Sequence, residues 1–231
     1  MQQTTFKKPR TKSPQSGNTG PKRDFRNNTR PARQVRPSST LDPSLFIKKA
    51  TDTKVQDYVS HRTFNDLPIS PSLKQSIAKK GFERPTEIQD RTIETLIEGR
   101  DLLGIAQTGT GKTGAFLIPI IEHLIHDRKK SFALVMVPTR ELATQVEDEF
   151  RSMSQGLNLS SLCFIGGTNI NRDLMNLKRP TNIVIGTPGR ILDLVSRRAL
   201  DLKPFNTLVL DEFDRMLDMG FVHDVKKIIG G

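Results

Sequence analysis

The sequence predicts an α/β domain with a mostly parallel sheet and helices on both of its faces. Three observations predict this fold. Apolar segments of strand length alternate with amphipathic segments of helical length. Some of the apolar segments, such as 132–137, carry no polar residue, which is typical of strands buried on both faces. A glycine-rich turn at 106–113 stands between a strand candidate and a helix candidate, and strands that alternate with helices form parallel βαβ units.

Two helices precede this alternation. Ser70 and Pro71 give the first helix a capping residue followed by a proline, and Gly81 ends it. Pro85 and Thr86 begin the second helix, which stops at Gly99.

The alternating elements then follow in order. The predicted strands cover residues 101–105, 132–137, 159–165, 182–186 and 207–211. The predicted helices cover residues 112–126, 140–154, 170–178, 189–197 and 220–229. Loops that follow parallel strands meet at one edge of the sheet, so we expect the functional loops there.

Basic residues gather at the N-terminal end of this 231-residue chain, whose formal net charge is +11. Residues 1–40 hold ten Lys and Arg against the single acid Asp24, whereas the remainder holds 26 basic and 24 acidic residues. The N-terminal segment is rich in Pro, Ser, Thr and Asn and poor in large apolar residues, so it cannot bury enough surface to fold alone. We therefore predict a basic disordered arm over 1–45 and one domain over 46–231. The arm is either a tether for nucleic acid or a solvated leader. A third interpretation is an organelle transit peptide, which the frequent prolines disfavour because such peptides form an amphipathic helix.

The apolar runs and the cysteine content indicate the cellular compartment of the protein. No apolar run approaches the ~18 residues of a membrane span, so no membrane contact is predicted. The single cysteine, Cys163, excludes an internal disulfide and fits a reducing compartment, so we expect a cytoplasmic protein.

The glycine-rich turn predicts a phosphate site. It consists of Ala106, Gln107, Thr108, Gly109, Thr110, Gly111, Lys112 and Thr113. Such a turn offers backbone N–H groups to phosphate oxygens, and the following helix directs its positive end at them. Lys112 can reach the β and γ phosphates and the Thr113 hydroxyl can bind Mg²⁺, although Ala106 stands where the usual pattern has glycine.

A second acidic half of the site follows strand 207–211. Asp211 ends that strand, and we assign it to Mg²⁺, while Glu212 can orient and polarise an attacking water. Acids at this place can also cap a helix. Capping would explain one acid but not the series that continues to Asp214.

Gln89 has two possible roles. Its amide can bond adenine N6 and N7 together, which would select ATP. It is also the third helical residue of a capping box that begins at Thr86. The residues alone leave both roles open.

Three further loops each follow a strand and precede a helix, so they should emerge beside the phosphate loop. Their residues are Pro138, Thr139, Arg140, Gly166, Gly167, Thr168, Thr187, Pro188, Gly189 and Arg190. Backbone N–H groups, hydroxyls and arginines suit phosphate oxygens, and no aromatic residue accompanies them for base stacking. This pattern predicts sequence-independent binding to a nucleic-acid backbone.

Together these stretches resemble the DEAD-box family of ATP-dependent RNA helicases. The matching stretches are 81–89, 106–113, 138–142, 166–167, 187–190 and 211–214, in family order across roughly residues 64–229. The resemblance implies a RecA-like first helicase domain that uses ATP and Mg²⁺, and it favours the adenine-reading role of Gln89.

The resemblance also implies roles for individual residues. Phe64 would pack against adenine, and Asp214 would join the network that links ATP to RNA. The implied contacts to the RNA backbone come from Arg140, Gly167, Thr187 and Arg190.

Two departures from the family pattern are visible. Phe213 replaces the alanine of the name-giving tetrapeptide, and because the acids around it are intact we expect altered packing but preserved chemistry. The chain stops at Gly231, before the Ser-Ala-Thr stretch and the second RecA-like domain, which supplies arginine fingers in the family. Such fingers are worth about 10³–10⁵ in rate, so we expect these residues alone to bind ATP weakly and hardly hydrolyse it.

The sequence therefore predicts a monomeric ATP-binding domain of an RNA helicase, whose partners are RNA and a second RecA-like domain. One alternative is a DNA helicase or translocase, which RNA and DNA stimulation would separate because 2′-hydroxyl contacts distinguish the polymers. The other is a non-catalytic nucleotide- or RNA-binding module, which adding a separately made second domain would separate.

Overall fold

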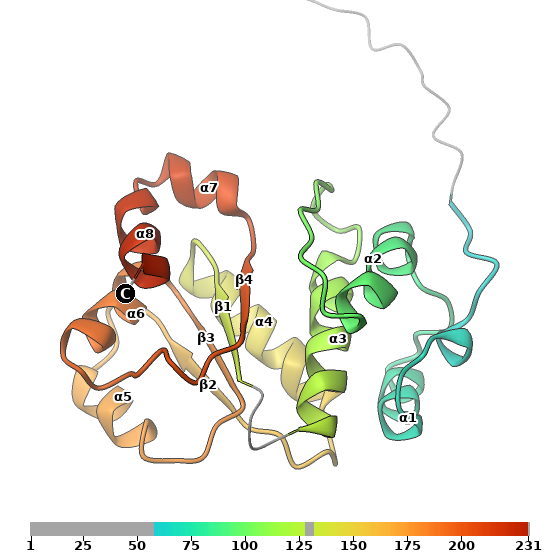
Figure 1. Cartoon of the computed structure of the whole chain (residues 1–231), viewed down its shortest axis with the longest axis horizontal. Coiled ribbons are helices and arrows are strands. Elements are labelled where there is room, and N and C mark those ends of the chain that lie inside the picture. The colour runs from blue at the N-terminus through green and yellow to red at the C-terminus, as the bar shows by residue number, and fades with distance from the viewer. Residues whose placement is uncertain (1–57, 128–131, 231) are drawn as a thin grey trace, which may run out of the picture. The chain divides into compact units, whose positions relative to one another are not determined.

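The computed structural model describes residues 58–127 and 132–230, and its core is a parallel sheet (Figure 1). The strands are β1 (Ala133–Met136), β2 (Ser161–Phe164), β3 (Ile183–Gly186) and β4 (Thr207–Leu210), in the order β2-β3-β1-β4. Ala133 of β1 pairs with Ile183 on one side and with Thr207 on the other. The predicted α/β class is confirmed, while the predicted arm over 1–45 lies outside the described residues.

Helices surround this sheet. They are α1 (Pro71–Lys79), α2 (Glu87–Ile97), α3 (Lys112–His126), α4 (Arg140–Met153), α5 (Ile170–Asn176), α6 (Pro188–Ser196), α7 (Phe213–Asp218) and α8 (Val222–Gly230), with a short 3-10 helix η2 (Phe64–Asp66). The predicted helices are confirmed to within a few residues at their ends. Helix α7 was not predicted, because six residues are too few to show a helical period. None of the helices in the described part of the chain is long and apolar enough to cross a membrane.

Alternate residues of β1 enter two separate hydrophobic cores. Ala133 and Val135, with Val137 directly after the strand, join the core formed with α1, α3 and α4. Leu134 and Met136 join the core formed with α6 and α8 on the other face. Because successive side chains of a strand point to opposite faces, a strand without polar residues requires cover on both faces.

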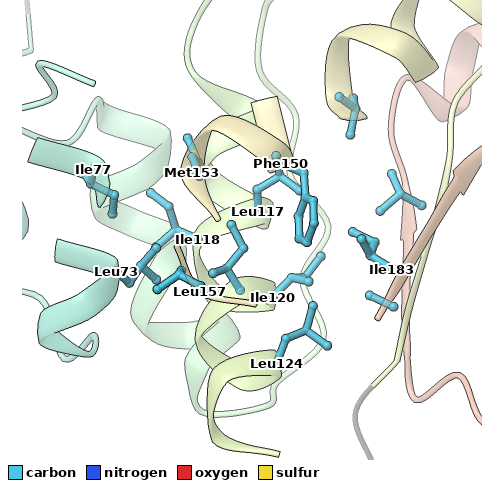
Figure 2. Close-up of a cluster of buried hydrophobic side chains, with 14 of the residues drawn as sticks. Leu73, Ile77, Leu117, Ile118, Ile120, Leu124, Phe150, Met153, Leu157 and Ile183 are labelled. Carbon is cyan, nitrogen blue, oxygen red and sulfur yellow. The ribbon is translucent and has the colours of Figure 1, made fainter. Parts of the chain in front are cut away.

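Helix α3 lies at the centre of the first core (Figure 2). Its Leu117 and Ile118 are fully buried, as are Leu73 of α1 and Phe150 of α4. Burying each such side chain contributes about 1.5–3 kcal/mol. The helix that follows the phosphate loop is therefore firmly fixed by apolar packing along its length.

The predicted strand over 101–105 is wrong. These residues form no strand, and Leu103 and Ile105 are 91% and 94% exposed. A strand needs a neighbour for its ladder of hydrogen bonds. A cavity of about 700 Å³, here called the β4 groove, lies between Leu102–Gly104 and residues 207–211, so β4 does not pair with this segment. Within the described sheet, β4 has β1 as its neighbour on one side.

Candidate functional site

The phosphate loop, residues 106–113, leads directly into α3. Gly109 and Gly111 have φ angles of 83° and 92°, a left-handed conformation that glycine adopts without steric cost. The Thr110 hydroxyl donates to the Gln107 carbonyl oxygen at 2.8 Å and closes the turn. The first N–H groups of a helix have no partner within it, so α3 presents them beside this turn.

Lys112 is folded back over the loop that precedes it. Its Nζ donates to the carbonyl oxygen of Ala106 at 2.8 Å. A phosphate at this place would compete with one neutral carbonyl oxygen for the ammonium group. A charged acceptor makes the stronger hydrogen bond, so the exchange favours the phosphate.

Gln89 connects α2 to the phosphate loop and is 6% exposed. Its Oε1 accepts from the Thr86 N–H at 3.1 Å, which confirms the capping role. Its Nε2 donates to the Gly111 carbonyl oxygen at 3.0 Å. A Cβ on Gly111 or Gly114 would lie 2.7 Å from that Nε2, so glycine at both positions allows α2 and α3 to approach. The adenine contact of Gln89 stays a prediction.

Phe64 lies in the first hydrophobic core. It is 4% exposed, and its N–H donates to the Glu83 carbonyl oxygen at 3.3 Å. Its described surroundings are therefore those of a core residue, and its contact with adenine stays a prediction.

Asp211 follows β4 and, like Lys112, lines the β4 groove. Its N–H donates to the Met136 carbonyl oxygen at 3.0 Å, which fixes its backbone to β1. Burial raises the pKa of the Asp211 carboxyl above its usual value, while the Lys112 ammonium group lowers it in part. The fold thus brings Asp211 within electrostatic range of Lys112 in the phosphate loop.

Glu212 has a left-handed backbone conformation, with φ 51° and ψ 48°, at the residue before α7. This conformation costs a residue with a side chain about 1–3 kcal/mol, and such residues cluster at functional sites. Its Oε2 accepts from Arg215 Nη1 at 3.1 Å. Asp214 is exposed in the first turn of α7, and Phe213 lines the β4 groove and is 39% exposed.

The three predicted loops, 138–140, 166–168 and 187–190, form what we call the three-loop edge. Thr139 accepts from the Leu142 N–H at 3.3 Å and thereby caps α4. Arg140 is exposed, and its guanidinium group lies so close to Gly167 that a Cβ there would collide with it. The first two loops are therefore in contact.

The third loop is mostly buried. Thr187 is 7% exposed and Arg190 is 9% exposed, whereas Gly189 is exposed. Arg190 donates to the carboxylate of Asp173 at 2.5 Å. The contact of Arg190 with RNA stays a prediction. Asp173 escaped sequence reasoning, because a single acid in a short helix carries no distinguishing spacing.

The chain is similar to known proteins over most of its length. The family model of the DEAD/DEAH box helicases matches residues 86–231. The ATP-dependent RNA helicase CshA of Listeria monocytogenes is 45% identical over 166 residues, which are 72% of this chain and 32% of that protein. The ATP-dependent rRNA helicase RRP3 of Candida albicans is 40% identical over 192 residues, 83% of this chain and 34% of the relative.

A solved structure agrees with these matches. The DEAD box protein from the hyperthermophile Methanococcus jannaschii superposes with a TM-score of 0.70 and 42% identity, over 74% of this chain and 47% of that chain. The chain spans about a third of the length of the curated relatives it matches.

Proposed function

We propose that this chain is the ATP-binding domain of an ATP-dependent RNA helicase. The premise is that the chain belongs to the DEAD/DEAH box helicase family. The observation that carries this proposal is that Lys112 and Asp211 both line the β4 groove, close enough for the lysine charge to lower the pKa of the carboxyl. A cation for phosphates and a carboxylate for a metal ion lie together there. The whole protein would couple ATP binding and hydrolysis to RNA binding and to the separation of a duplex, with a second RecA-like domain.

The phosphates of ATP would bind at the amino end of α3. Backbone N–H groups of residues 107–113 would donate to the phosphate oxygens. Lys112 would leave the carbonyl oxygen of Ala106, its present partner at 2.8 Å, and bind the β and γ phosphates.

Asp211 and Thr113 would hold Mg²⁺. The donor set fits, because Asp211 is a carboxylate whose pKa is raised by burial and whose ionised form a cation would stabilise. Within residues 58–127 and 132–230 no group of three or more His, Cys, Asp or Glu could hold a metal ion. A site with few protein ligands suits Mg²⁺, which keeps waters and phosphate oxygens in its shell. When bound, Mg²⁺ neutralises negative charge on the phosphates.

Glu212 would orient the attacking water, and the ion pair with Arg215 holds its side chain at that place. Gln89 would read adenine with Phe64 beside the base. The Gln89 amide has two N–H donors and two acceptor positions. One donor is used on Gly111 and one acceptor position on Thr86, so each half of the amide keeps capacity for the base.

RNA would bind at the three-loop edge through its phosphates. The exposed groups there are the Arg140 side chain and the backbones of Gly167 and Gly189. Their contacts would be independent of sequence, because guanidinium and N–H groups directed at phosphates read no base. Asp214 would link the two sites from the first turn of α7, between Glu212 and Arg215.

Calorimetric titration of the chain with ATP and Mg²⁺ tests the nucleotide site. Lys112→Ala should weaken binding about 10- to 100-fold, because it removes a charged hydrogen bond to phosphate. Lys226→Ala, an exposed lysine of α8, is the matched control and should change nothing. Equal affinities for the chain and for Lys112→Ala would contradict the proposed site.

A further inference from the structure

Two buried opposite charges meet behind the three-loop edge. Asp173 of α5 is 4% exposed, Arg190 of α6 is 9% exposed, and Arg190 Nη1 donates to Asp173 Oδ2 at 2.5 Å. Removing both charges from water costs about as much as their attraction returns, so such a pair adds little net stability. The best-attested use of a buried polar pair is to fix one arrangement of the elements that carry it.

Arg190 also holds the neighbouring turn at 166–168. Its Nη2 donates to the Thr168 carbonyl oxygen at 2.8 Å. The Thr168 hydroxyl donates to the Ile165 carbonyl oxygen at 2.9 Å and lies 3.4 Å from Asp173 Oδ2. One guanidinium group therefore connects the start of α6 to the turn and to α5.

A second arginine contacts the same turn. Gly167 has a left-handed φ of 77°, and the guanidinium group of Arg140 occupies the space that a side chain on Gly167 would need. Arg140 is exposed, whereas Arg190 is buried and paired. The turn is thus contacted by Arg140, which is exposed to a ligand, and by Arg190, whose guanidinium group is bonded within the protein.

We propose that the Asp173–Arg190 ion pair is a positioning element for RNA binding. It fixes the turn at 166–168 against the start of α6, so that Arg140 and the exposed backbones of Gly167 and Gly189 form one rigid phosphate-binding edge. Groups held in place before binding lose less freedom on binding, which strengthens affinity. This inference rests on the proposed function, and it makes Arg190 a positioning residue instead of a contact residue.

The two roles of Arg190 predict opposite results for Asp173→Asn. If Arg190 contacted RNA, loss of the Asp173 charge would free its guanidinium group, and RNA affinity would be kept or would rise. If the pair positions the turn, Arg190 is left buried without its counter-charge and the turn loosens. The affinity for single-stranded oligouridine then falls about tenfold or more, because small displacements of positioned groups are costly.

The matched control is Asp193→Asn on the same helix. Asp193 pairs with Arg197 at 2.8 Å, but both side chains are about half exposed, and such pairs contribute little. The control should leave RNA affinity unchanged. Neither Asp173→Asn nor Asp193→Asn should alter the affinity for ATP with Mg²⁺.

A salt series sharpens the assignment. Each phosphate contact to a single strand contributes about 0.7 to the slope of log affinity against log salt. Arg140→Ala should lower the slope by that amount. The double variant Asp173→Leu/Arg190→Leu should weaken binding but keep the slope, and it leaves no buried charge unpaired. The double variant carries the same test if Asp173→Asn unfolds the chain. A slope lowered in the double variant would overturn the proposal.

Amide hydrogen exchange tests the positioning role without RNA. The N–H groups of Arg172 and Ile191, at the starts of α5 and α6, donate to the carbonyl oxygens of Asn169 and Thr187 at 3.1 Å. Asp173→Asn should speed exchange at both amides, and Asp193→Asn should not. If the unsubstituted chain does not bind oligouridine, the proposed function fails while the exchange result still decides the role of the pair. Unchanged exchange, or RNA affinity kept in Asp173→Asn, would overturn the inference.

Discussion

The phosphate loop and the loops of the three-loop edge each lead into a helix, but their turns are stabilised differently. At the three-loop edge, the turns are bonded to neighbouring helices: Thr139 caps α4, and Arg190 of α6 donates to the Thr168 carbonyl oxygen. Asn169, next to the second loop, caps α5. The phosphate loop follows a segment in which Ile105 is 94% exposed and outside the sheet.

Lys112 at the phosphate loop is bonded to a carbonyl of its own loop. Lys112 is bonded to a neutral carbonyl oxygen, and burial raises the pKa of the Asp211 carboxyl, so a charged ligand can offer both groups a stronger partner. Arg190 is buried and already has a carboxylate partner. The turns of the three-loop edge are therefore held by protein groups, whereas the proposed nucleotide would supply contacts that the phosphate loop lacks.

The largest expected effect contrasts two isoleucines. Ile185 in β3 is fully buried, so Ile185→Ala should lower the free energy of unfolding by about 2–5 kcal/mol. Ile105→Ala should change it by less than about 0.5 kcal/mol, because that side chain is already in water. Urea unfolding of both variants measures the difference. Equal losses would mean that residues 101–105 pack against the sheet after all.

A pair of glycines gives a smaller effect. Both lie in the first turn of a helix, Gly114 in α3 and Gly189 in α6. Gly114→Ala would place a Cβ 2.7 Å from Gln89 Nε2 and should cost about 1–3 kcal/mol of stability through overpacking.

Gly189→Ala is the control for that substitution. Its Cβ would meet Asp224 Oδ2 at 3.7 Å, an ordinary contact, so stability should stay level or rise. Thermal unfolding in the absence of nucleotide measures both variants. Loss of stability in Gly189→Ala alone would reverse our assignment of the close approach to α2 and α3.

The smallest expected effect is a pH dependence at Asp211. Burial raises the pKa of this carboxyl from 3.8, so its protonated form is favoured in the folded chain. The stability that protonation provides is present below the unfolded pKa and is lost as pH rises through the folded pKa.

Asp211→Asn removes that dependence. The variant should therefore be slightly more stable than the chain at neutral pH without nucleotide, and the difference should disappear below the unfolded pKa. Unfolding midpoints across a pH series measure this. A variant less stable than the chain at neutral pH would contradict the cost of burying the ionised carboxylate.

Local sequence was enough to predict the helices and strands whose apolar pattern lies within the segment itself. The run 132–137 and the helix after Gly111 carry their signal within a few residues, and both were found. Residues 101–105 have the same apolar character, but a strand also needs a neighbour, and sequence does not say which segment lies beside it. The β4 groove separates that segment from β4.

The candidate site shows the same division. The turn, Lys112, Asp211 and Glu212 were predicted because their spacing along the chain reflects their chemistry. The role of Arg190 could not be read from sequence, because an arginine that binds phosphate and one that pairs with a buried acid have the same letter. The structure shows that Arg190 donates to Asp173, 17 residues away in the chain. Its role toward RNA stays a proposal.

Amide hydrogen exchange with and without ATP and Mg²⁺ tests the contrast most directly. We predict that amides of residues 107–113 exchange fast in the free chain and slow on adding nucleotide. The amides of Thr187, Arg190 and Ile191, which donate to backbone carbonyl oxygens, should be slow in both. Fast exchange at Thr187, Arg190 and Ile191 in the free chain, or no change at 107–113 on adding nucleotide, would contradict the account.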